Sequence, residues 1–409
     1  MQTRSVAIRH VVPAVLIWLA TPACESSSGL ESPELTSGTL TLIIATSGGP
    51  GAAHYDVVVD DSIHISASPN DSITVDLGPQ HHGFEIRGLG QCTISPSSRK
   101  SAGFSFTNEQ KVRWFATYVR CPFAPLHGRI VFDGQPANGG FALYSIRSDG
   151  TDQWLLLEEE RFPLQLGVSE WFVRPQVSPD GRRIASAVLS NLLNIPSPGD
   201  SVRQPGIGVI SGDSYTVVRL PQLIGSGHDW SPDGNKIVAT GAGDGVDLFI
   251  ENADGSERRR LTADSGNESL PSWSPDGQRI AFVVDECDIA VIDTSGAAKA
   301  VIVSQPECET GPAWSPDGNL LAFVRMEEPG PGFPSWHGVL YVVNPDGSGE
   351  RRVVAPSSAN VMSPPTWSPD GKQLAFGTQG TVWVTNVDGT GLRAISGAGN
   401  YVPWPDWSR

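Results

Sequence analysis

The sequence predicts an all-β chain, in which a small β-sandwich is followed by a six-bladed β-propeller. Three observations lead to this fold class. The 45 glycines and 33 prolines make up nearly a fifth of the 409 residues, so turns must be numerous and long helices few. The tetrapeptide Ser-Pro-Asp-Gly occurs five times. Its copies are 41 to 53 residues apart, which is about the length of one propeller blade.

Residues 1–23 are predicted to be an export signal. Two arginines precede an apolar stretch, residues 11–20, which is too short to span a bilayer as a permanent helix. Cys24 follows a small residue, and this arrangement resembles the lipobox of bacterial lipoproteins, in which the cysteine carries the lipid. The alternative is ordinary cleavage near Ala23. The Ser- and Glu-rich residues 24–37 are then expected to form a flexible tether.

Residues 38–122 are predicted to form the sandwich, because short alternating apolar runs are separated by turn residues. The segment resembles PEGA-like or immunoglobulin-like modules of exported bacterial proteins only in strand spacing and in its two cysteines. No functional residue can therefore be assigned from that resemblance.

Each Ser-Pro-Asp-Gly is predicted to be a turn between two strands. Ser suits the first position of a type I turn, Pro sets φ at the second, and Gly lets the chain enter the next strand. A tryptophan precedes four of the five copies, and a truncated sixth copy ends the chain. We expect these tryptophans to pack between neighbouring blades. They are Trp230, Trp273, Trp314, Trp367 and Trp407.

Every repeat continues in the same way. An apolar strand follows the turn, then a third strand, an Asp-Gly turn and a short fourth strand, so each unit is an antiparallel meander of strands a to d. Trp-Ser-Pro-Asp-Gly followed by Ile-Ala-Phe resembles the PD40 repeat of the TolB-like propellers of the bacterial periplasm, over residues 123–409. Five units are complete. The orphan strand b at 128–132 and the C-terminal strand a at 402–408 complete a sixth blade and close the ring.

The loops of such a meander lie on two faces. The a–b and c–d turns share one face and are short. The b–c loops and the connections between blades share the other, here called the variable face, which carries two long insertions, residues 190–205 and 326–338. Variable loops above a rigid scaffold commonly carry function, so this is the predicted binding surface.

Four cysteines follow the predicted signal and Cys24, and an even number in an exported chain predicts two disulfides. Cys287 falls in a b–c loop and Cys308 in the next connection between blades, so both lie on the variable face. We therefore expect Cys287 to bond to Cys308. Cys92 and Cys121 then pair within the sandwich.

The variable face of the fourth and fifth blades is rich in acids. Such a cluster can attract a basic partner or hold Ca²⁺, or it can be a solvated rim, and its spacing is not that of a calcium loop. Nearby aromatic residues are typical of protein-binding patches. Two histidines are expected in loops of this face, where they are either part of a site or simply solvated. The candidate binding residues are His228, Asp285, Glu286, Glu307, Glu327, Glu328, Phe333, Trp336 and His337.

No catalytic, metal or cofactor motif occurs in the sequence, which lacks Gly-x-Ser-x-Gly, His-Glu-x-x-His, Cys-x-x-Cys and a P-loop. A net charge of −16 argues against nucleic-acid binding. The TolB-like resemblance implies a non-catalytic scaffold of the cell envelope that presents a propeller face to a protein or peptide. We expect a monomer that meets the membrane only through its lipid. TolB-like proteins carry an α/β N-terminal domain rather than a sandwich, so their particular partners are not assumed.

The alternative is a propeller-type hydrolase or lyase that acts on a glycan or an ester. Two carboxylates at glycosidase separation in the mouth of the channel would favour this enzyme, and their absence would favour the scaffold.

Overall fold

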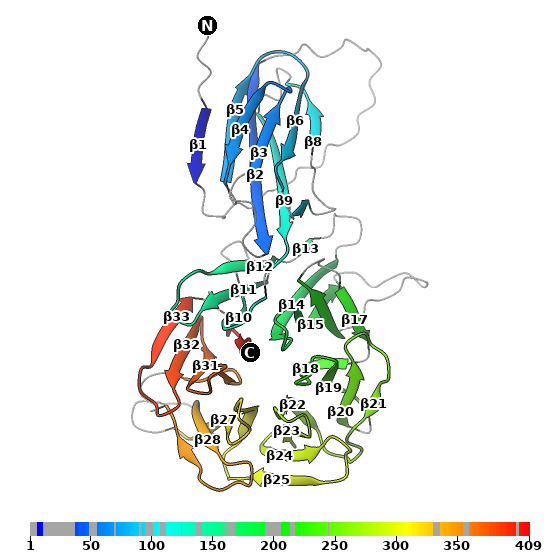
Figure 1. The fold of residues 1–409 in the computed structure, drawn as a ribbon, viewed down its shortest axis with the longest axis vertical. Helices are drawn as coiled ribbons and strands as arrows, with labels where there is room; N and C mark the ends of the chain where they lie inside the picture. The colour runs from blue at the N-terminus through cyan, green and yellow to red at the C-terminus, as the bar shows by residue number, and fades with distance from the viewer. Residues whose placement is uncertain are drawn as a thin grey trace. The chain divides into compact units, whose positions relative to one another are not determined.

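Every regular element among the described residues is a β-strand, as the sequence predicts (Figure 1). None of these residues forms an apolar helix long enough to cross a membrane. The chain divides into two compact units, Met1–Pro122 and Phe123–Arg409. The computed structural model describes residues 6–10, 37–48, 55–68, 71–89, 92–94, 101–106, 112–123, 125–135, 141–158, 160–161, 168–192, 206–212, 217–221, 223–243, 245–329, 336–354, 360–397 and 401–409.

The first unit is built from two sheets around one apolar core, as expected for a sandwich. Side chains alternate in burial along its strands; in one of them Phe84 and Ile86 are buried while Arg87 is exposed. Cys92 and Cys121 are disulfide-bonded at the edge of this core, as predicted. One sheet has the order β1 (Val6–His10), β5 (Asp71–Leu77), β2 (Gly38–Gly48), β9 (Val112–Cys121) and β7 (Thr93–Ile94). The other has the order β4 (Ile63–Ala67), β3 (Tyr55–Val59), β6 (His82–Arg87) and β8 (Ser101–Phe104).

The structure does not test the predicted signal, tether and lipidation site, which stay predictions. Within residues 1–36 the structure describes only β1, which pairs antiparallel with β5. Cys24 lies outside the described residues.

The second unit is a ring of six antiparallel sheets (Figure 1). Blade 1 consists, from the inside out, of β34 (Asp406–Trp407), β10 (Arg129–Gly134), β11 (Ala142–Arg147) and β12 (Trp154–Glu158). Blade 2 consists of β14 (Val168–Val177), β15 (Arg183–Leu192), β16 (Gly206–Ser211) and β17 (Val217–Pro221), and the short strand β13 (Glu160–Arg161) pairs with β14. Blade 3 consists of β18 (Leu223–Trp230), β19 (Lys236–Ala242), β20 (Val246–Asn252) and β21 (Arg259–Arg260). Blade 4 consists of β22 (Glu268–Trp273), β23 (Arg279–Val284), β24 (Asp288–Asp293) and β25 (Lys299–Val303). Blade 5 consists of β26 (Glu309–Trp314), β27 (Leu321–Glu327), β28 (His337–Val343) and β29 (Arg351–Arg352). Blade 6 consists of β30 (Thr366–Trp367), β31 (Gln373–Thr378), β32 (Thr381–Asn386) and β33 (Arg393–Gly397).

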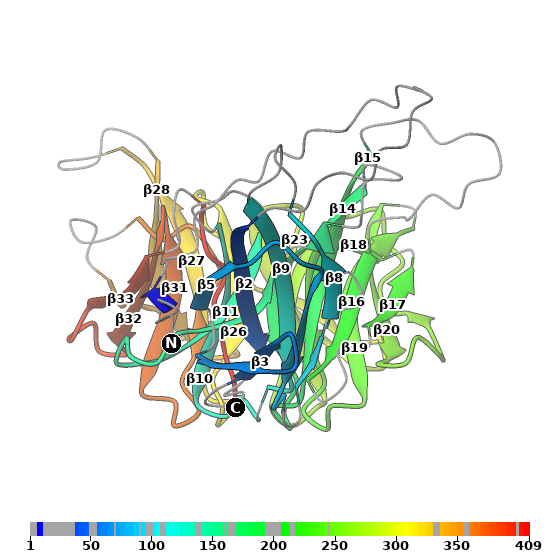
Figure 2. The same ribbon diagram turned by 90° about the horizontal axis from the view of Figure 1, so that it is seen from above.

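The ring is closed by the last strand of the chain. Strand β34 pairs with β10, and Trp407 lies opposite Ile130. Figure 2 shows the propeller strands from the side, running between the two faces. The blade that joins the two ends of the propeller segment is therefore the composite blade predicted from the repeats.

The repeat tryptophans pack between blades, as predicted. Trp230 lies among Ile207 and Val209 of the preceding blade, and its indole N–H donates to the carbonyl of Gln176 (3.0 Å). Trp367 repeats the arrangement one half-turn of the ring away, donating to the carbonyl of Ala313 (2.9 Å). All five tryptophans are at most 5 % exposed.

Candidate functional site

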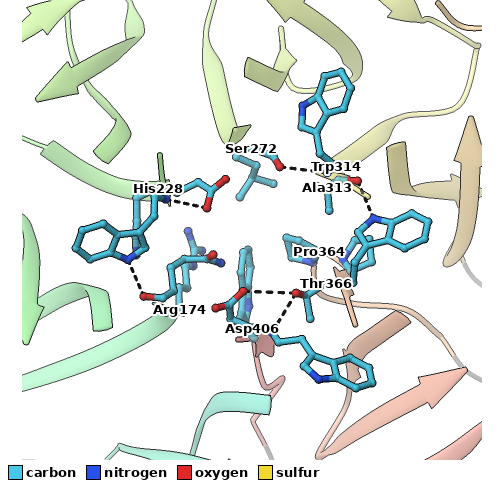
Figure 3. Close-up of a pocket in the computed structure, with 18 of the residues that line it drawn as sticks. Arg174, His228, Ser272, Ala313, Trp314, Pro364, Thr366 and Asp406 are labelled. Carbon is cyan, nitrogen blue, oxygen red and sulfur yellow. Dashed lines mark hydrogen bonds between the residues drawn. The ribbon is translucent and has the colours of Figure 1, made fainter. Parts of the chain in front are cut away.

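The inner strands of all six blades line a cavity of about 100 Å³ on the axis of the propeller. Figure 3 shows residues from these strands surrounding it. Those labelled from the six inner strands include Arg174, His228, Ser272, Ala313, Thr366 and Asp406.

A bulge shapes several of these inner strands. The ladder to strand b shifts register near Arg174, Leu270 and Gly311, and each of these residues has a positive φ, between 50° and 62°. A proline follows each of the three in the sequence. A bulge re-aims the side chains that come after it. Here the re-aimed residue is the one directly before the closing Trp or Val of the strand.

The residue directly before the Trp bonds to the neighbouring blade in four of the six inner strands, of which only β22 has one of these three bulges. Asp229 accepts the backbone N–H of Trp273 (2.6 Å), and Asp406 accepts that of Val177 (2.7 Å). The Ser272 hydroxyl accepts the backbone N–H of Trp314 (3.3 Å), and the Thr366 hydroxyl accepts that of Trp407 (3.0 Å). We call these four residues the inter-blade latches. They are Asp229, Ser272, Thr366 and Asp406.

The two latch carboxylates have raised pKa values. Burial raises the pKa of Asp229 to about 6 and that of Asp406 to about 7, and the charge of Asp229 adds to the second shift. Arg409, at the end of the chain, opposes both shifts. The remaining oxygens also accept hydrogen bonds, one from the N–H of Trp230 (2.8 Å) and one from the hydroxyl of Thr366 (3.4 Å). Every carboxylate oxygen of the pair therefore already accepts a hydrogen bond, and three of the four bonds come from a neighbouring blade.

A third buried carboxylate, Asp133, orders another part of the channel wall. It accepts the backbone N–H groups of Arg174 (2.8 Å) and Trp404 (2.7 Å), and burial raises its pKa to about 6. The Arg174 guanidinium in turn lies over the Trp404 ring, 4.2 Å from its centre. This contact joins β14 of blade 2 to the segment that leads into β34 of blade 1.

The prediction that His228 and His337 lie in loops is wrong, and neither is solvated. His228 lies within β18 and is 5 % exposed, at a position where the other five blades have proline. Burial lowers its pKa to about 4, and a backbone contact at Ala185 opposes the shift only in part. Neither ring nitrogen meets hydrogen-bond geometry with a described residue. His337 begins β28, is 3 % exposed, and lies 3.9 Å from the Glu327 carboxylate. Both strands begin earlier than the sequence pattern indicates.

The predicted acidic residues differ in exposure. Asp285, Glu286 and Glu328 are exposed and Glu307 is half-buried. Glu327 is engaged, because it accepts the Tyr341 hydroxyl (2.7 Å) and pairs with Arg352. Among the described residues no group of three or more His, Cys, Asp or Glu side chains is arranged to hold a metal ion.

Another acid of this region, Glu309, does not lie in a loop. It is fully buried in β26, where it accepts a hydrogen bond from Arg325 (2.8 Å). Trp336 is 51 % exposed, as a binding residue requires. Phe333 lies outside the described residues.

Cys287 and Cys308 are disulfide-bonded on this face, as predicted. Replacing both with serine is expected to lower the propeller's free energy of unfolding by about 3 kcal/mol, because the bond closes a loop of 21 residues. Urea unfolding of the oxidised wild type and the double variant measures the difference. The same replacement at Cys92 and Cys121 should leave the propeller transition unchanged. A propeller midpoint that is equal in the first variant and the wild type contradicts the prediction.

No family model matches the chain. Among curated proteins, an uncharacterized peptidase YuxL of Bacillus subtilis is 40% identical over 57 residues, 13% of this chain and 9% of that protein. The Tol-Pal system protein TolB of Alcanivorax borkumensis is 37% identical over 71 residues, 17% of this chain and 16% of that protein. The matched segments thus span less than a fifth of these relatives.

Among solved structures, TolB from Acinetobacter baumannii superposes with a TM-score of 0.55 at 19% identity, over 70% of this chain and 67% of that one. This likeness is one of fold. The second unit is a TolB-like β-propeller, in agreement with the resemblance seen in the repeats.

Proposed function

We propose that this chain, whose second unit is a TolB-like β-propeller, is a non-catalytic binding protein of the cell envelope. Its variable face would receive a protein or peptide partner. The observation that carries the proposal is that the acidic side chains of the propeller differ in their surroundings. The acids of the channel are engaged in holding blades together, whereas acids and an aromatic side chain stand exposed on the variable face.

The cell-envelope location rests on three features. Two disulfides suit an oxidising compartment. The predicted export signal and the cysteine at its end would deliver the chain and tether it by one lipid. Third, one curated protein with a similar segment is a component of a Tol-Pal system.

A second function, hydrolysis or elimination on a glycan or an ester, is favoured by one observation. Asp229 and Asp406 line a single cavity and carry raised pKa values, as catalytic acids often do. Incubating the protein with acidic and neutral polysaccharides tests this function. Turnover that is lost in Asp406→Asn, while the variant stays folded, would establish the enzyme and overturn the scaffold.

The proposed function predicts that partner capture depends on the variable face. Residues 329–335 would be replaced by a Gly-Ser linker of equal length, and envelope extract of the source organism passed over the immobilised wild type and variant. We expect a partner that the wild type retains and the variant loses. The control replaces the c–d turn around Asp346, on the opposite face, and should retain the partner. Equal recovery on wild type and loop variant contradicts the placement of the binding surface.

A further inference from the structure

On the variable face, Trp336 stands just before β28 and Met362 in the connection from blade 5 to blade 6, and we call these two side chains the apolar patch. These side chains are 51 % and 47 % exposed, and both belong to the few large apolar residues left open among the described residues. They flank a tight contact between β28 and the connection to blade 6. In it, Val361 donates to the carbonyl of Gly338 (2.9 Å), and a Cβ on Gly338 would lie only 1.9 Å from the Val361 oxygen. Only glycine permits this approach.

The backbone under the patch is held firmly. The amide of Gly338 donates to the Asn360 side chain (2.8 Å), and that of Met362 donates to the carbonyl of Gly377 in blade 6 (2.9 Å). Val361, which lies between Asn360 and Met362 in the sequence, is 1 % exposed. Two half-exposed apolar side chains on such a rigid base are pre-organised for contact.

An acidic ridge leads to this patch. We define it as Glu286, Glu307 and Glu328. The first two stand next to the disulfide Cys287–Cys308, and the carbonyl of Cys308 accepts the N–H of Met326 (2.9 Å), two residues before Glu328. In the ladder of β27 and β28, Glu327 lies opposite His337. Glu328 and Trp336 are the next residues outward from that pair, so the ridge ends at the patch.

The ridge has an excess of negative charge. Three cations of blades 4 and 5 already have carboxylate partners: Lys299 pairs with Asp264 (2.7 Å), Arg325 with Glu309 (2.8 Å), and Arg352 with Glu327. Within the described ranges no Lys, Arg or His lies within ion-pair distance of a ridge carboxylate. A partner that brings cations would therefore meet unneutralised acids.

We infer that the Trp336–Met362 patch and the acidic ridge together form a docking surface for a positively charged protein segment, which anchors one apolar side chain on the patch. This inference rests on the proposed function, since it names the chemistry of the partner. The apolar anchor supplies affinity through Trp336 and the adaptable Met362 thioether. Lysine or arginine beside the anchor meets the ridge, and a cation placed over the Trp336 ring gains a further contact.

The test uses two labelled synthetic peptides of equal length with the same Leu and Phe residues, one with Lys and the other with Glu at the remaining positions. Fluorescence anisotropy measures their binding to the full chain. We expect only the Lys peptide to bind, and Trp336→Ala to weaken it about tenfold. The matched control is Val301→Ala, on the outer strand β25, because Val301 is equally exposed at 51 %. It should bind like the wild type.

Charge is tested separately. Replacing Glu286, Glu307 and Glu328 with Gln is expected to weaken the Lys peptide about fivefold and to flatten its dependence on salt. No binding of the Lys peptide, equal binding of both peptides, or equal affinity of the Trp336→Ala and Val301→Ala variants overturns the inference. If the envelope extract still yields a partner in those cases, the proposed function stands. If the wild type captures no partner at all, the proposed function fails whatever the peptides do.

Discussion

Replacing Trp407 with alanine is expected to lower the propeller's free energy of unfolding by about 3–5 kcal/mol, the largest effect of any single side chain considered. Trp407 is 5 % exposed and packs against Ile130 and Phe132 of its own blade and Val384 of blade 6. Its indole N–H also donates to the carbonyl of Gly128 (3.2 Å). Alanine leaves a cavity and removes this hydrogen bond at the closure, where the ends of the propeller segment meet.

Urea unfolding followed by tryptophan fluorescence measures this loss. The matched control is Trp336→Ala, which removes the same side chain from a position that is 51 % exposed. It should change the free energy of unfolding by less than about 0.5 kcal/mol. A Trp407→Ala variant as stable as this control would show that ring closure does not depend on the tryptophan.

The blades could be predicted because each one is encoded locally. A Ser-Pro-Asp-Gly turn needs only its own four residues: in every copy, as at Ser231 and Asp233, the Ser hydroxyl donates to the Asp carboxylate two residues on (2.5 Å). The alternating strands and the truncated last repeat then determine the ring closure. The disulfide Cys287–Cys308 followed from the same topology.

The latches could not be predicted in this way. Asp229 and Trp273 are 44 residues apart and belong to different blades, so their contact depends on how neighbouring blades pack. The residue before the five repeat tryptophans varies along the chain, and two of the five are Asp, which is the one local signal in the sequence. Met362 is not among the predicted binding residues for a similar reason, since only its environment distinguishes it from a core methionine.

The histidines show where loop assignment fails. His228 follows a Gly-Ser-Gly segment that reads as a loop, yet β18 begins at Leu223. A comparison of aligned repeats would have shown His228 in the place of a channel-wall proline. His337 falls within the predicted insertion 326–338, whose last two residues are the first two of β28.

The stability of the wild type relative to Asp406→Asn is expected to fall by about 3 kcal/mol between pH 5 and pH 8. The folded pKa of Asp406 is raised to about 7 from an ordinary value of 3.8. Between these values the folded state holds a proton that the unfolded state has released. Stability from this group is therefore full below pH 3.8 and is lost as the pH rises through 7. Asparagine cannot titrate, yet its side-chain oxygen can still accept the N–H of Val177.

The difference between variants is the right measure because another group opposes Asp406. His228 has a folded pKa of about 4, below its ordinary 6.5, so its contribution rises with pH over part of the same range. Subtracting the Asp406→Asn curve cancels that contribution as long as the imidazole is unaffected.

The control for the pH measurement is Asp346→Asn. The Ser348 hydroxyl lowers the pKa of Asp346, so this group is ionised in the folded and unfolded states from pH 5 to 8. Its curve should run parallel to that of the wild type. Parallel curves for Asp406→Asn as well would mean that the latch carboxylate is hydrated in solution. The hydrogen bonds from Val177 and Thr366 would then hold an ordinary surface acid, and the channel would be open to water at the closing blade.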